Sequence, residues 1–507
     1  AAGTYYLDCG NGTGVRTINK TTTSEETFTC VNRTGNTIGL AGQATGYNTA
    51  VISFSGNTKI KSVDGSLGAI FGGSADYMFH NTFADCTSLT SIPENLFAGV
   101  SGSADYMFYS TFRGCTSLTS IPEKLFTGVS DSAYSMFSST FADCTSLTEI
   151  PEKLFAGVSG NAPEMFYMTF ANCTSLTTIY GNLFSYIEDG TAVGVSGVSD
   201  SMFQGTFENC ESLTEIPENL FAGIQNSAYR AFAFTFAGCT SLESIPGKLF
   251  ANIQDAADEM FSRTFRGCTS VKTITGDLFN SIYGWAPESA FQGTFADCES
   301  LESIPKDIFV NITGSSDRGF LGVFAGCKSL KELPDGLFKN ITYASDSGAF
   351  ENAFYGCTNL SGYVPVNMFQ NLSAEYFESS TMENIFSDTG LDAVCPSGMY
   401  QYITGFESAW SGKVSCASCP DGTTSDVGST DKSQCVSSVK LHIGDDAVLN
   451  LLPTRPTTSP VMVFQVGDTQ YYAPTSNTET PVNSGTNTKY RILYEDTDYW
   501  VHDYTVQ

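Results

Sequence analysis

The stretch "FADCTSLTEIPEKLF" at residues 141–155 decides the fold, because the chain repeats it with few changes. Closely similar phrases read "FADCTSLTSIPENLF" at 83–97 and "FRGCTSLTSIPEKLF" at 112–126. A catalytic motif is needed once, whereas a structural unit can recur. The repetition therefore predicts an array of similar units.

The spacing of the cysteines gives the length of the unit. Ten of the sixteen recur at intervals of 29, 29, 29, 37, 29, 29, 30, 29 and 30 residues. A period of this length is typical of a solenoid, in which a unit cannot bury its apolar face alone and stacks on its neighbours. We call these residues the ladder cysteines: Cys86, Cys115, Cys144, Cys173, Cys210, Cys239, Cys268, Cys298, Cys327 and Cys357.

The repeated unit reads FxxCTSLTxIPxxLFxxVxxSAxxMFxxT. Its short run from Ser117 to Ile121, closed by a proline, predicts one brief strand per coil, and stacked coils would pair these strands in parallel. The segments "EKLFTGV" at 123–129 and "SAYSMFSSTFADC" at 132–144 place apolar residues at helical spacing, with Ser132 as a candidate cap. The predicted fold is an α/β solenoid with coils of about 29 residues, each with one short parallel strand and one or two short helices.

The signature FxxCxxLxxI followed by Pro resembles the leucine-rich repeats, and within them the BspA-like type of bacterial and protist surface proteins. It is present as Phe112, Cys115, Leu118, Ile121 and Pro122, and again as Phe236, Cys239, Leu242, Ile245 and Pro246. The resemblance covers about residues 57–396 and implies recognition or adhesion at a cell surface. The repeat is longer than the usual short form, which implies more helix on the convex side, and eight extra residues around "EDGTAVGVSG" at 188–197 are expected to form a loop.

Each ladder cysteine follows a phenylalanine by three residues and in most coils precedes a leucine by three, and both neighbours are expected to point inward. The pattern therefore predicts buried free thiols rather than reactive or metal-binding ones. The alternative is bridging along the ladder, since neighbouring strands lie about 4.8 Å apart. Side chains in register on parallel strands point the same way, which disfavours that alternative.

The other six cysteines favour an oxidising compartment. Cys9 and Cys30 bracket the N-terminal segment, and we expect them to form a disulfide that staples it. The stretches "CPSGMY" at 395–400 and "CASCPDGTTSDVGSTDKSQC" at 416–435 resemble ephrin-receptor-like cysteine-rich modules. That resemblance implies the pairs Cys395–Cys416 and Cys419–Cys435. The alternative is a four-cysteine zinc site, for which only Cys416 and Cys419 are suitably close.

The chain divides, by these patterns, into four predicted domains. Residues 1–56 form a β-rich N-terminal cap, 57–394 the solenoid, 395–435 the disulfide-rich module and 436–507 a C-terminal β domain. The last domain is predicted from "VKLHIGDDAVLNLL", "VMVFQVGDTQYYA" and "KYRILYEDTDYWVHDY", which alternate β-branched or aromatic residues with polar ones.

The net charge limits the kinds of partner that this protein can bind. With 24 basic and 53 acidic residues the net charge is −29, which opposes nucleic acids and anionic lipid surfaces. No run approaches the roughly 18 apolar residues of a membrane span. The opening "AAGTYYLDCG" is what a mature secreted protein looks like behind a cleaved signal peptide, so we expect a secreted, extracellular or cell-surface protein.

The sequence offers little catalytic chemistry. The histidines, His80, His442 and His502, are far apart, and no hydrolase, phosphate-loop or dinucleotide motif occurs in a suitable context. We therefore predict a protein that is not an enzyme, with no catalytic residues, cofactor or metal site.

The residues at one strand position of successive coils form a row along the predicted sheet, which could be an ordinary solvated surface or an ice-binding array. Successive coils carry Thr90, Thr119, Thr148, Thr177 and Thr214, as in the flat threonine arrays of ice-binding solenoids, but continue with Glu243, Lys272, Glu302 and Lys331. This break favours an ordinary solvated strand surface. Eight Asn-x-Ser/Thr sequons, including Asn11, Asn311, Asn340 and Asn371, are candidate glycosylation sites, and Asn172 beside a ladder cysteine is the least suited.

Two functions fit these features. The predicted one is a non-enzymatic, secreted cell-surface protein that acts through protein–protein contacts, as a structural or self-assembling component of a filament or matrix, with itself as partner through the terminal domains. The alternative is an adhesin that binds host matrix proteins or glycans. An adhesin should expose an aromatic cluster, and the candidate residues are scattered over the coils: Tyr180, Tyr186, Tyr229, Tyr283 and Trp285.

Overall fold

The structure is a computed structural model of residues 1–507. It describes the chain except for residues 32–35, 47–51, 189–190, 276, 374–375, 377–379, 404–409, 411, 422, 441–460, 467–468, 474–489, 495–496, 502–504 and 507. The chain forms two compact units. Unit 1 comprises Ala1–Ser361, Asn367–Gly390 and Ala409–Ser411, and unit 2 comprises Gly362–Val366, Leu391–Ser408 and Gly412–Gln507.

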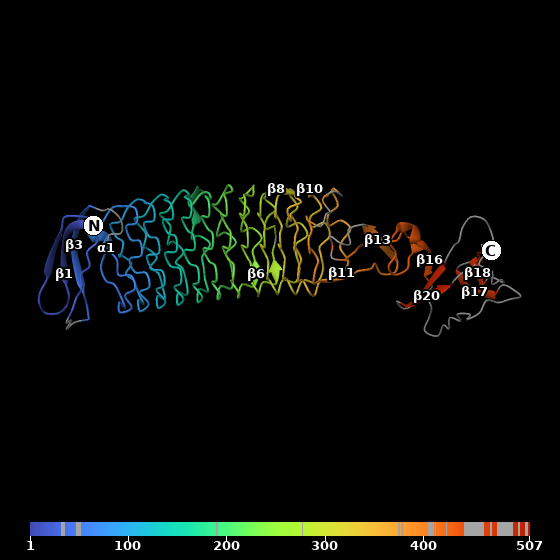
Figure 1. The fold of residues 1–507 in the computed structure, drawn as a ribbon, viewed down its shortest axis with the longest axis horizontal. Helices are drawn as coiled ribbons and strands as arrows, with labels where there is room; N and C mark the ends of the chain where they lie inside the picture. The colour runs from blue at the N-terminus through green and yellow to red at the C-terminus, as the bar shows by residue number, and fades with distance from the viewer. Residues whose placement is uncertain are drawn as a thin grey trace. The chain divides into compact units, whose positions relative to one another are not determined.

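Unit 1 is built of coils stacked side by side (Figure 1), which confirms the predicted repeat solenoid. In the segment that ends at each ladder cysteine, alternate backbone groups bond within the coil and between coils. The N–H of Tyr109 donates to the Tyr106 carbonyl of its own coil at 3.1 Å, and the N–H of Ser110 donates to the Ser138 carbonyl of the next coil at 2.9 Å. The Tyr109 carbonyl accepts from Asn81 of the preceding coil at 3.0 Å, so all these backbone groups are paired.

This segment, which we call the turn ribbon, comprises the ladder cysteine of a coil and the ten residues before it, such as residues 105–115. Every fourth residue of the ribbon has a positive φ, as at Tyr106 (57°), Ser110 (51°) and Gly114 (71°). The predicted helix in this segment is therefore wrong. An α-helix needs right-handed φ at every residue and a bond to the residue four back, whereas here half of the N–H groups leave for the next coil.

The segment after the proline is not helical either. Val129 donates to the Phe126 carbonyl and Leu125 to the Pro122 carbonyl, each three residues back, as in consecutive turns. Ser132, predicted as a helix cap, instead donates its hydroxyl to the Asn161 carbonyl of the next coil at 2.9 Å. In the described part of the chain, α1 (Leu67–Ile70) is the single α-helix, so the α/β class is corrected to a solenoid of turns and short strands.

The predicted parallel strand is present but minimal. It is assigned in two neighbouring coils, β6 (Ser244–Ile245) and β7 (Thr273–Ile274), which pair in parallel. Elsewhere it is reduced to single bonds, such as Thr177 N to Thr148 O at 3.0 Å. A second parallel sheet, which the sequence did not predict, joins β8 (Gly284–Ala286), β9 (Ile312–Ser315) and β10 (Tyr343–Ala344).

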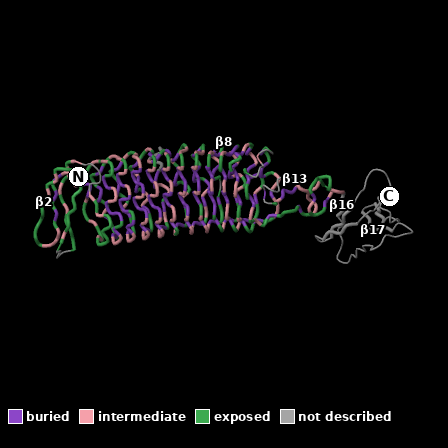
Figure 2. Tube along the Cα trace, viewed as in Figure 1, coloured by how far each residue is buried: buried purple, intermediate pink, exposed green. Residues whose placement is uncertain are grey.

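The core of the coils consists of stacked files of identical side chains. Figure 2 shows that buried residues recur from coil to coil along the trace. Three phenylalanine files run through it, with neighbouring ring centres 5.5 Å apart for Phe108 and Phe137 and 5.3 Å apart for Phe112 and Phe141. A buried threonine file lies beside them: Thr82, Thr111, Thr140, Thr169, Thr206, Thr235, Thr264 and Thr294. The Thr140 hydroxyl lies 2.9 Å from the Phe108 carbonyl and 2.7 Å from the Phe137 carbonyl.

The insert after Cys173 is not a plain loop. Strands β4 (Ser185–Glu188) and β5 (Thr191–Gly194) pair antiparallel within it. The β-branched Thr191 and Val193 suit a strand, which corrects the prediction of a loop there. Two further short strands, β11 (Ser361–Gly362) and β12 (Gly390–Leu391), lie near the end of the repeats.

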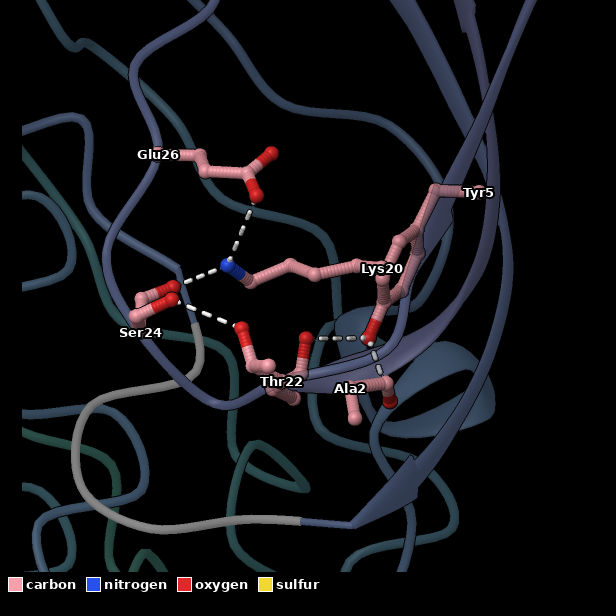
Figure 3. A network of polar contacts seen from close by, with 7 residues as sticks. Ala2, Tyr5, Lys20, Thr22, Ser24 and Glu26 are labelled. Atoms are coloured by element: carbon pink, nitrogen blue, oxygen red, sulfur yellow. Dashed lines mark hydrogen bonds and ion pairs between the residues drawn. The ribbon is translucent and has the colours of Figure 1, made fainter.

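The N-terminal segment folds as an antiparallel sheet of order β2-β1-β3, made of β1 (Ala2–Asp8), β2 (Arg16–Lys20) and β3 (Gly39–Gly46). The Tyr5 ring lies 5.9 Å from that of Phe71, so the sheet contacts the first coil. A polar network fixes the strand ends (Figure 3): the Tyr5 hydroxyl donates to the Ala2 carbonyl at 3.1 Å, and Lys20 pairs with Glu26 at 3.7 Å.

Unit 2 is made of strands. Its first hairpin joins β13 (Met399–Ile403) and β14 (Ser415–Ser418) around a small core of Cys395, Val414 and Cys416. Two sheets have the orders β15-β16-β19-β20 and β17-β18-β21. Their elements, with one 3₁₀-helix, are β15 (Thr423–Thr424), η2 (Lys432–Gln434), β16 (Val436–Lys440), β17 (Val461–Val466), β18 (Thr469–Ala473), β19 (Tyr490–Tyr494), β20 (Thr497–Val501) and β21 (Thr505–Val506).

Candidate recognition surface

Five aromatic rings from three consecutive turn ribbons contact one another on the surface of the solenoid. We call them the N-terminal aromatic cluster: Tyr77, His80, Tyr106, Tyr109 and Tyr134. The rings of Tyr77 and Tyr106 are stacked, with centres 4.5 Å apart and planes 7° from parallel. Tyr134 meets Tyr106 edge-on at 5.1 Å, and His80 lies 5.2 Å from Tyr109.

The turn ribbon explains why these rings meet. Within it, Met107 and Phe108 are fully buried, whereas Tyr106 and Tyr109 on either side of them are only half-buried. Two inward residues thus alternate with outward ones in steps of four residues. The backbone N–H of Tyr77 donates to the carbonyl of Asp105 in the next coil at 2.9 Å. Since Asp105 directly precedes Tyr106, this bond brings Tyr77 and Tyr106, which are 29 residues apart, face to face.

The cluster is flanked by carboxylates. The Asp76 carboxylate accepts a hydrogen bond from the backbone N–H of Asp105 at 3.1 Å, and the Asp105 carboxylate accepts one from the backbone N–H of Tyr134 at 2.9 Å. Burial, together with Tyr106 and these two carboxylates, raises the pKa of Tyr77, so its hydroxyl stays neutral. Burial lowers the pKa of His80, which favours the uncharged imidazole. The surface therefore combines neutral rings with negative charge.

A second group of rings lies on the unpredicted sheet. Trp285 of β8 and Tyr343 of β10 stack at 4.8 Å, and Tyr376 meets Tyr343 edge-on at 5.0 Å. Gly314 of β9 lies between them, and a side chain there would come within 3.1 Å of the Trp285 ring. Glycine at this position therefore lets the tryptophan lie against the sheet.

The aromatic residues singled out in the sequence do not form one cluster. Tyr180, Tyr229, Tyr283 and Trp285 are all exposed, by 39% to 58%. Tyr229 contacts Arg230 rather than another predicted residue, and the side chain of Tyr186 lies outside the described part of the chain. Sequence reasoning missed the N-terminal aromatic cluster, although the repetition of "SADYMF" at 74–79 and 103–108 carried the signal.

The ladder cysteines are fully buried free thiols, each of which bonds to the preceding coil. The Cys144 thiol donates to the Phe112 carbonyl at 3.2 Å, and Cys173 to that of Phe141 at 3.3 Å. Burial raises the pKa of the Cys173 thiol to about 12 and that of Cys86 to about 11. The thiols are therefore protonated and poorly nucleophilic at neutral pH.

The remaining six cysteines lie in three disulfides: Cys9–Cys30, Cys395–Cys416 and Cys419–Cys435. Because Cys416 and Cys419 belong to different disulfides, they do not form the close pair that the zinc alternative requires. In the described ranges, no group of three or more His, Cys, Asp or Glu side chains could hold a metal ion. His442 and His502 fall outside those ranges.

The threonine file on the strand surface is exposed and bonded to its own backbone. The Thr177 hydroxyl donates to the Thr148 carbonyl at 3.1 Å. Farther along the same file, Lys331 and Glu302 form an ion pair at 2.6 Å, which lowers the pKa of Glu302. The part of the file that carries the charged residues Glu302 and Lys331 is thus a solvated strand surface.

The sequons differ in their surroundings. The Asn311 amide donates to the Asn280 carbonyl at 2.7 Å and that of Asn340 to Val310 at 2.6 Å, both part-buried. The amide of Asn172 bonds to Asp143 at 2.8 Å. In contrast, Asn371 is exposed.

Comparison with known proteins gives two similarities. Residues 386–435 match the family model described as "Tyrosine-protein kinase ephrin type A/B receptor-like", which confirms the resemblance for that segment. Among solved structures, a leucine-rich cell surface protein from Faecalibacterium prausnitzii A2-165 matches at 20% identity over 59% of this chain and 82% of that chain, with a TM-score of 0.24. No curated protein matches the chain. No helix in the described part is long and apolar enough to span a membrane.

Proposed function

We propose that this chain is a non-enzymatic cell-surface protein that recognises another extracellular protein through the side of its solenoid. The observation that carries this proposal is the N-terminal aromatic cluster. Tyrosine and tryptophan dominate the binding energy of protein interfaces, because they bury large rigid surfaces and keep a polar tip. A group of five partly exposed rings has no role in the core, which the phenylalanine files already fill.

The ephrin-receptor-like segment supports an extracellular location, since disulfides persist in oxidising compartments. We further propose that the coil of about 29 residues is the unit of the solenoid, that residues 1–56 and 436–507 form terminal β-rich domains, and that the protein is secreted. In this scheme residues 57–394 present the recognition surface and 395–435 connect it to the C-terminal strands.

The test is a surface plasmon resonance screen of the full chain against extracellular matrix proteins and glycans. We expect at least one matrix protein to bind, and the double variant Tyr77→Ser, Tyr106→Ser to weaken binding by about tenfold or more. The matched control Thr148→Ser, Thr177→Ser alters two exposed side chains of the strand file and should leave binding unchanged. Binding of glycans alone, or equal binding by both variants, would contradict recognition of a protein by the cluster.

Self-assembly into a filament or matrix is the second candidate. The order β2-β1-β3 leaves β2 at an edge of the N-terminal sheet, and an edge strand offers unpaired N–H and C=O groups to another chain. Negative-stain microscopy with light scattering should compare the full chain with a version that lacks residues 1–35. Fibres that disappear on truncation would establish assembly through this segment, whereas monomers in both samples would exclude it under those conditions.

A further inference from the structure

The solenoid contains an arginine that is already bound by an aromatic ring and a carboxylate. The Arg230 guanidinium lies 4.8 Å from the centre of the Tyr229 ring. It also forms two hydrogen bonds with Glu259 of the next coil, at 2.8 and 2.9 Å. The Tyr229 hydroxyl donates to the same carboxylate at 3.1 Å. Ring, cation and carboxylate thus form one unit on the surface of two adjacent turn ribbons.

The N-terminal aromatic cluster has the same ring and carboxylate without the cation. Counted from the ladder cysteines, Tyr134 is ten residues before Cys144 and Tyr229 ten before Cys239, so the two tyrosines are equivalent. By the same count Glu164 corresponds to Glu259, and Ser135 stands where Arg230 stands. The Ser135 hydroxyl donates to Glu164 at 2.8 Å.

No basic side chain of this region takes the place of that arginine. Residues 74–81, 103–110 and 132–139, which supply the cluster, contain no lysine or arginine. Arg113, which lies farther along the same turn ribbon as Tyr106 and Tyr109, is paired with Asp143 at 3.1 Å. Asp76, Asp105 and Glu164 therefore give the cluster a negative rim.

We propose that the N-terminal aromatic cluster binds an arginine side chain of a basic segment in the partner protein. The guanidinium would lie on the Tyr106 and Tyr134 rings and pair with Glu164, as Arg230 lies on Tyr229 and pairs with Glu259. A cation within about 6 Å of a ring centre is attracted by the ring face, and the planar guanidinium also forms paired bonds with a carboxylate. The net charge of −29 attracts a basic partner over a longer range. This inference rests on the proposed function.

The first experiment measures fluorescence polarisation with a labelled nine-residue peptide of alternating arginine and glycine, at about 150 mM salt to limit long-range attraction. We expect Tyr106→Leu to weaken binding of the peptide about tenfold. The matched control is Tyr355→Leu, because Tyr355 is 44% exposed and its hydroxyl faces a carboxylate, Asp388, but it lies outside the cluster. This control should bind within about twofold of the unchanged protein. The corresponding lysine peptide should bind several-fold more weakly, since an ammonium group cannot stack flat.

The second experiment supplies the arginine from the chain itself. Ser135 has a φ of 48°, and Arg230, at the equivalent position of a later coil, has a similar φ of 54°. Asp131, shortly before Ser135, has one of 56°. The backbone at position 135 therefore accepts arginine. We expect Ser135→Arg to place a guanidinium between Tyr134 and Glu164 and to abolish peptide binding while the circular dichroism spectrum stays unchanged. The control Ser139→Arg lies four residues further along the same ribbon, also at a positive φ of 54°, and should retain binding.

Three results would overturn the inference: no peptide binding, equal loss in the Tyr106→Leu and Tyr355→Leu variants, or full binding by Ser135→Arg. The same variants are then tested on any matrix protein found in the screen. If that protein binds and the variants leave its affinity unchanged, the proposed function stands and arginine recognition by the cluster fails. If no matrix protein binds but the arginine peptide binds and its variants behave as expected, the proposed function fails, whereas arginine binding by the N-terminal aromatic cluster is upheld.

Discussion

The buried cysteines and the buried threonine file of the coils bond to backbone carbonyls of the neighbouring coil. The thiol of Cys144 and the hydroxyl of Thr140 are both fully buried and reach the carbonyls of Phe112 and Phe108, respectively. A buried polar group without a partner would destabilise the fold. These two files therefore hold the stack together as donors, and the chemical reactivity of the thiol is suppressed by the same burial.

The first prediction concerns thiol reactivity. At pH 8 the native protein should not react with iodoacetamide at any of its ten ladder cysteines, because burial keeps the thiols protonated, with the pKa of Cys239 raised to about 12. Mass spectrometry counts the added groups. Alkylation should be complete in denaturant, and the variant Thr148→Cys, with one thiol on the exposed strand file, should gain one group in the native state. Rapid native labelling of the ladder would show that it is accessible.

The second prediction concerns the threonine file. Thr140→Val keeps the shape of the side chain but removes its hydroxyl, so the free energy of unfolding should fall by about 1 kcal/mol. Val323 is fully buried at the equivalent position of a later coil, four residues before Cys327, which indicates that valine fits there. Thr148→Val on the exposed file serves as the control, with an expected change within about 0.5 kcal/mol. Urea titration followed by circular dichroism measures both, and equal effects would exclude a role for the buried hydroxyl.

The turn ribbon is the element that sequence reasoning predicted wrongly, as a helix. The apolar residues Met136, Phe137, Phe141 and Cys144 recur in steps close to four, which fits both an α-helix and a series of four-residue turns. The residues between them distinguish the two. Asp143 has a φ of 61° and Ser139 one of 54°, but aspartate and serine also occur in helices, so a local pattern could not settle the choice. The solenoid followed from the spacing alone, because a period needs no knowledge of the backbone, whereas burial of the thiols was predicted from the phenylalanine three residues before each ladder cysteine and the leucine three residues after most of them.

The third prediction tests the left-handed positions. Ser139→Val should destabilise the protein by about 1–2 kcal/mol, because a β-branched side chain disfavours a positive φ. Ser139→Gly should leave stability unchanged or raise it, since glycine adopts this conformation without strain. Thermal unfolding of both variants beside the unchanged chain measures the difference. If both substitutions had the same effect, the side chain rather than the backbone would be responsible.

The fourth prediction is a loss of stability in alkaline solution. The ladder thiols have folded pKa values raised above the ordinary 9.0, as for Cys173 at about 12. In the unfolded chain they lose their protons near pH 9, so the stability that comes from burying neutral thiols is complete below that pH and falls as the pH rises toward 12. Each thiol contributes a slope of about 1.4 kcal/mol per pH unit.

The melting temperature, measured between pH 8 and 11, should therefore fall steeply above pH 9. Tyrosines also titrate in this range, so the control is the variant Cys144→Ala, Cys173→Ala, which removes two of the ten free thiols. Its slope should be about one fifth shallower, from the same proportion of titrating groups. An unchanged slope would assign the alkaline transition to other groups.

At the scale of unit 1, each coil contacts its two neighbours through equivalent atoms. The aromatic surface could not be predicted from one coil, because it forms only when Tyr77, Tyr106 and Tyr134 from three coils are set side by side. The proposed recognition surface therefore depends on the stacking of coils, whereas the stability of a solenoid is approximately a sum over its repeats and their interfaces.

The fifth prediction follows from this equivalence. Deletion of residues 211–239, one whole interval between ladder cysteines, should leave a folded solenoid with a slightly lower melting temperature, because Phe207 and Cys210 meet the same neighbours in the next coil. Deletion of residues 225–239 should abolish folding, since it places unlike positions in register. Circular dichroism and thermal unfolding distinguish the two, and similar behaviour of both deletions would show that register is not required.

The alternation of bonds in the turn ribbon also has a mechanical consequence. The bonds between coils, such as that from Ser110 to Ser138, join one layer of the stack to the next, whereas the bonds within a coil lie inside a layer. A pulling force along the stack therefore loads one interface at a time, and the weakest interface opens first. Each sequence repeat of about 29 residues would release about 100 Å of chain when it unravels. Unit 1 would thus lengthen under force in equal steps, one coil at a time, and would limit the force that it transmits rather than act as a rigid tether.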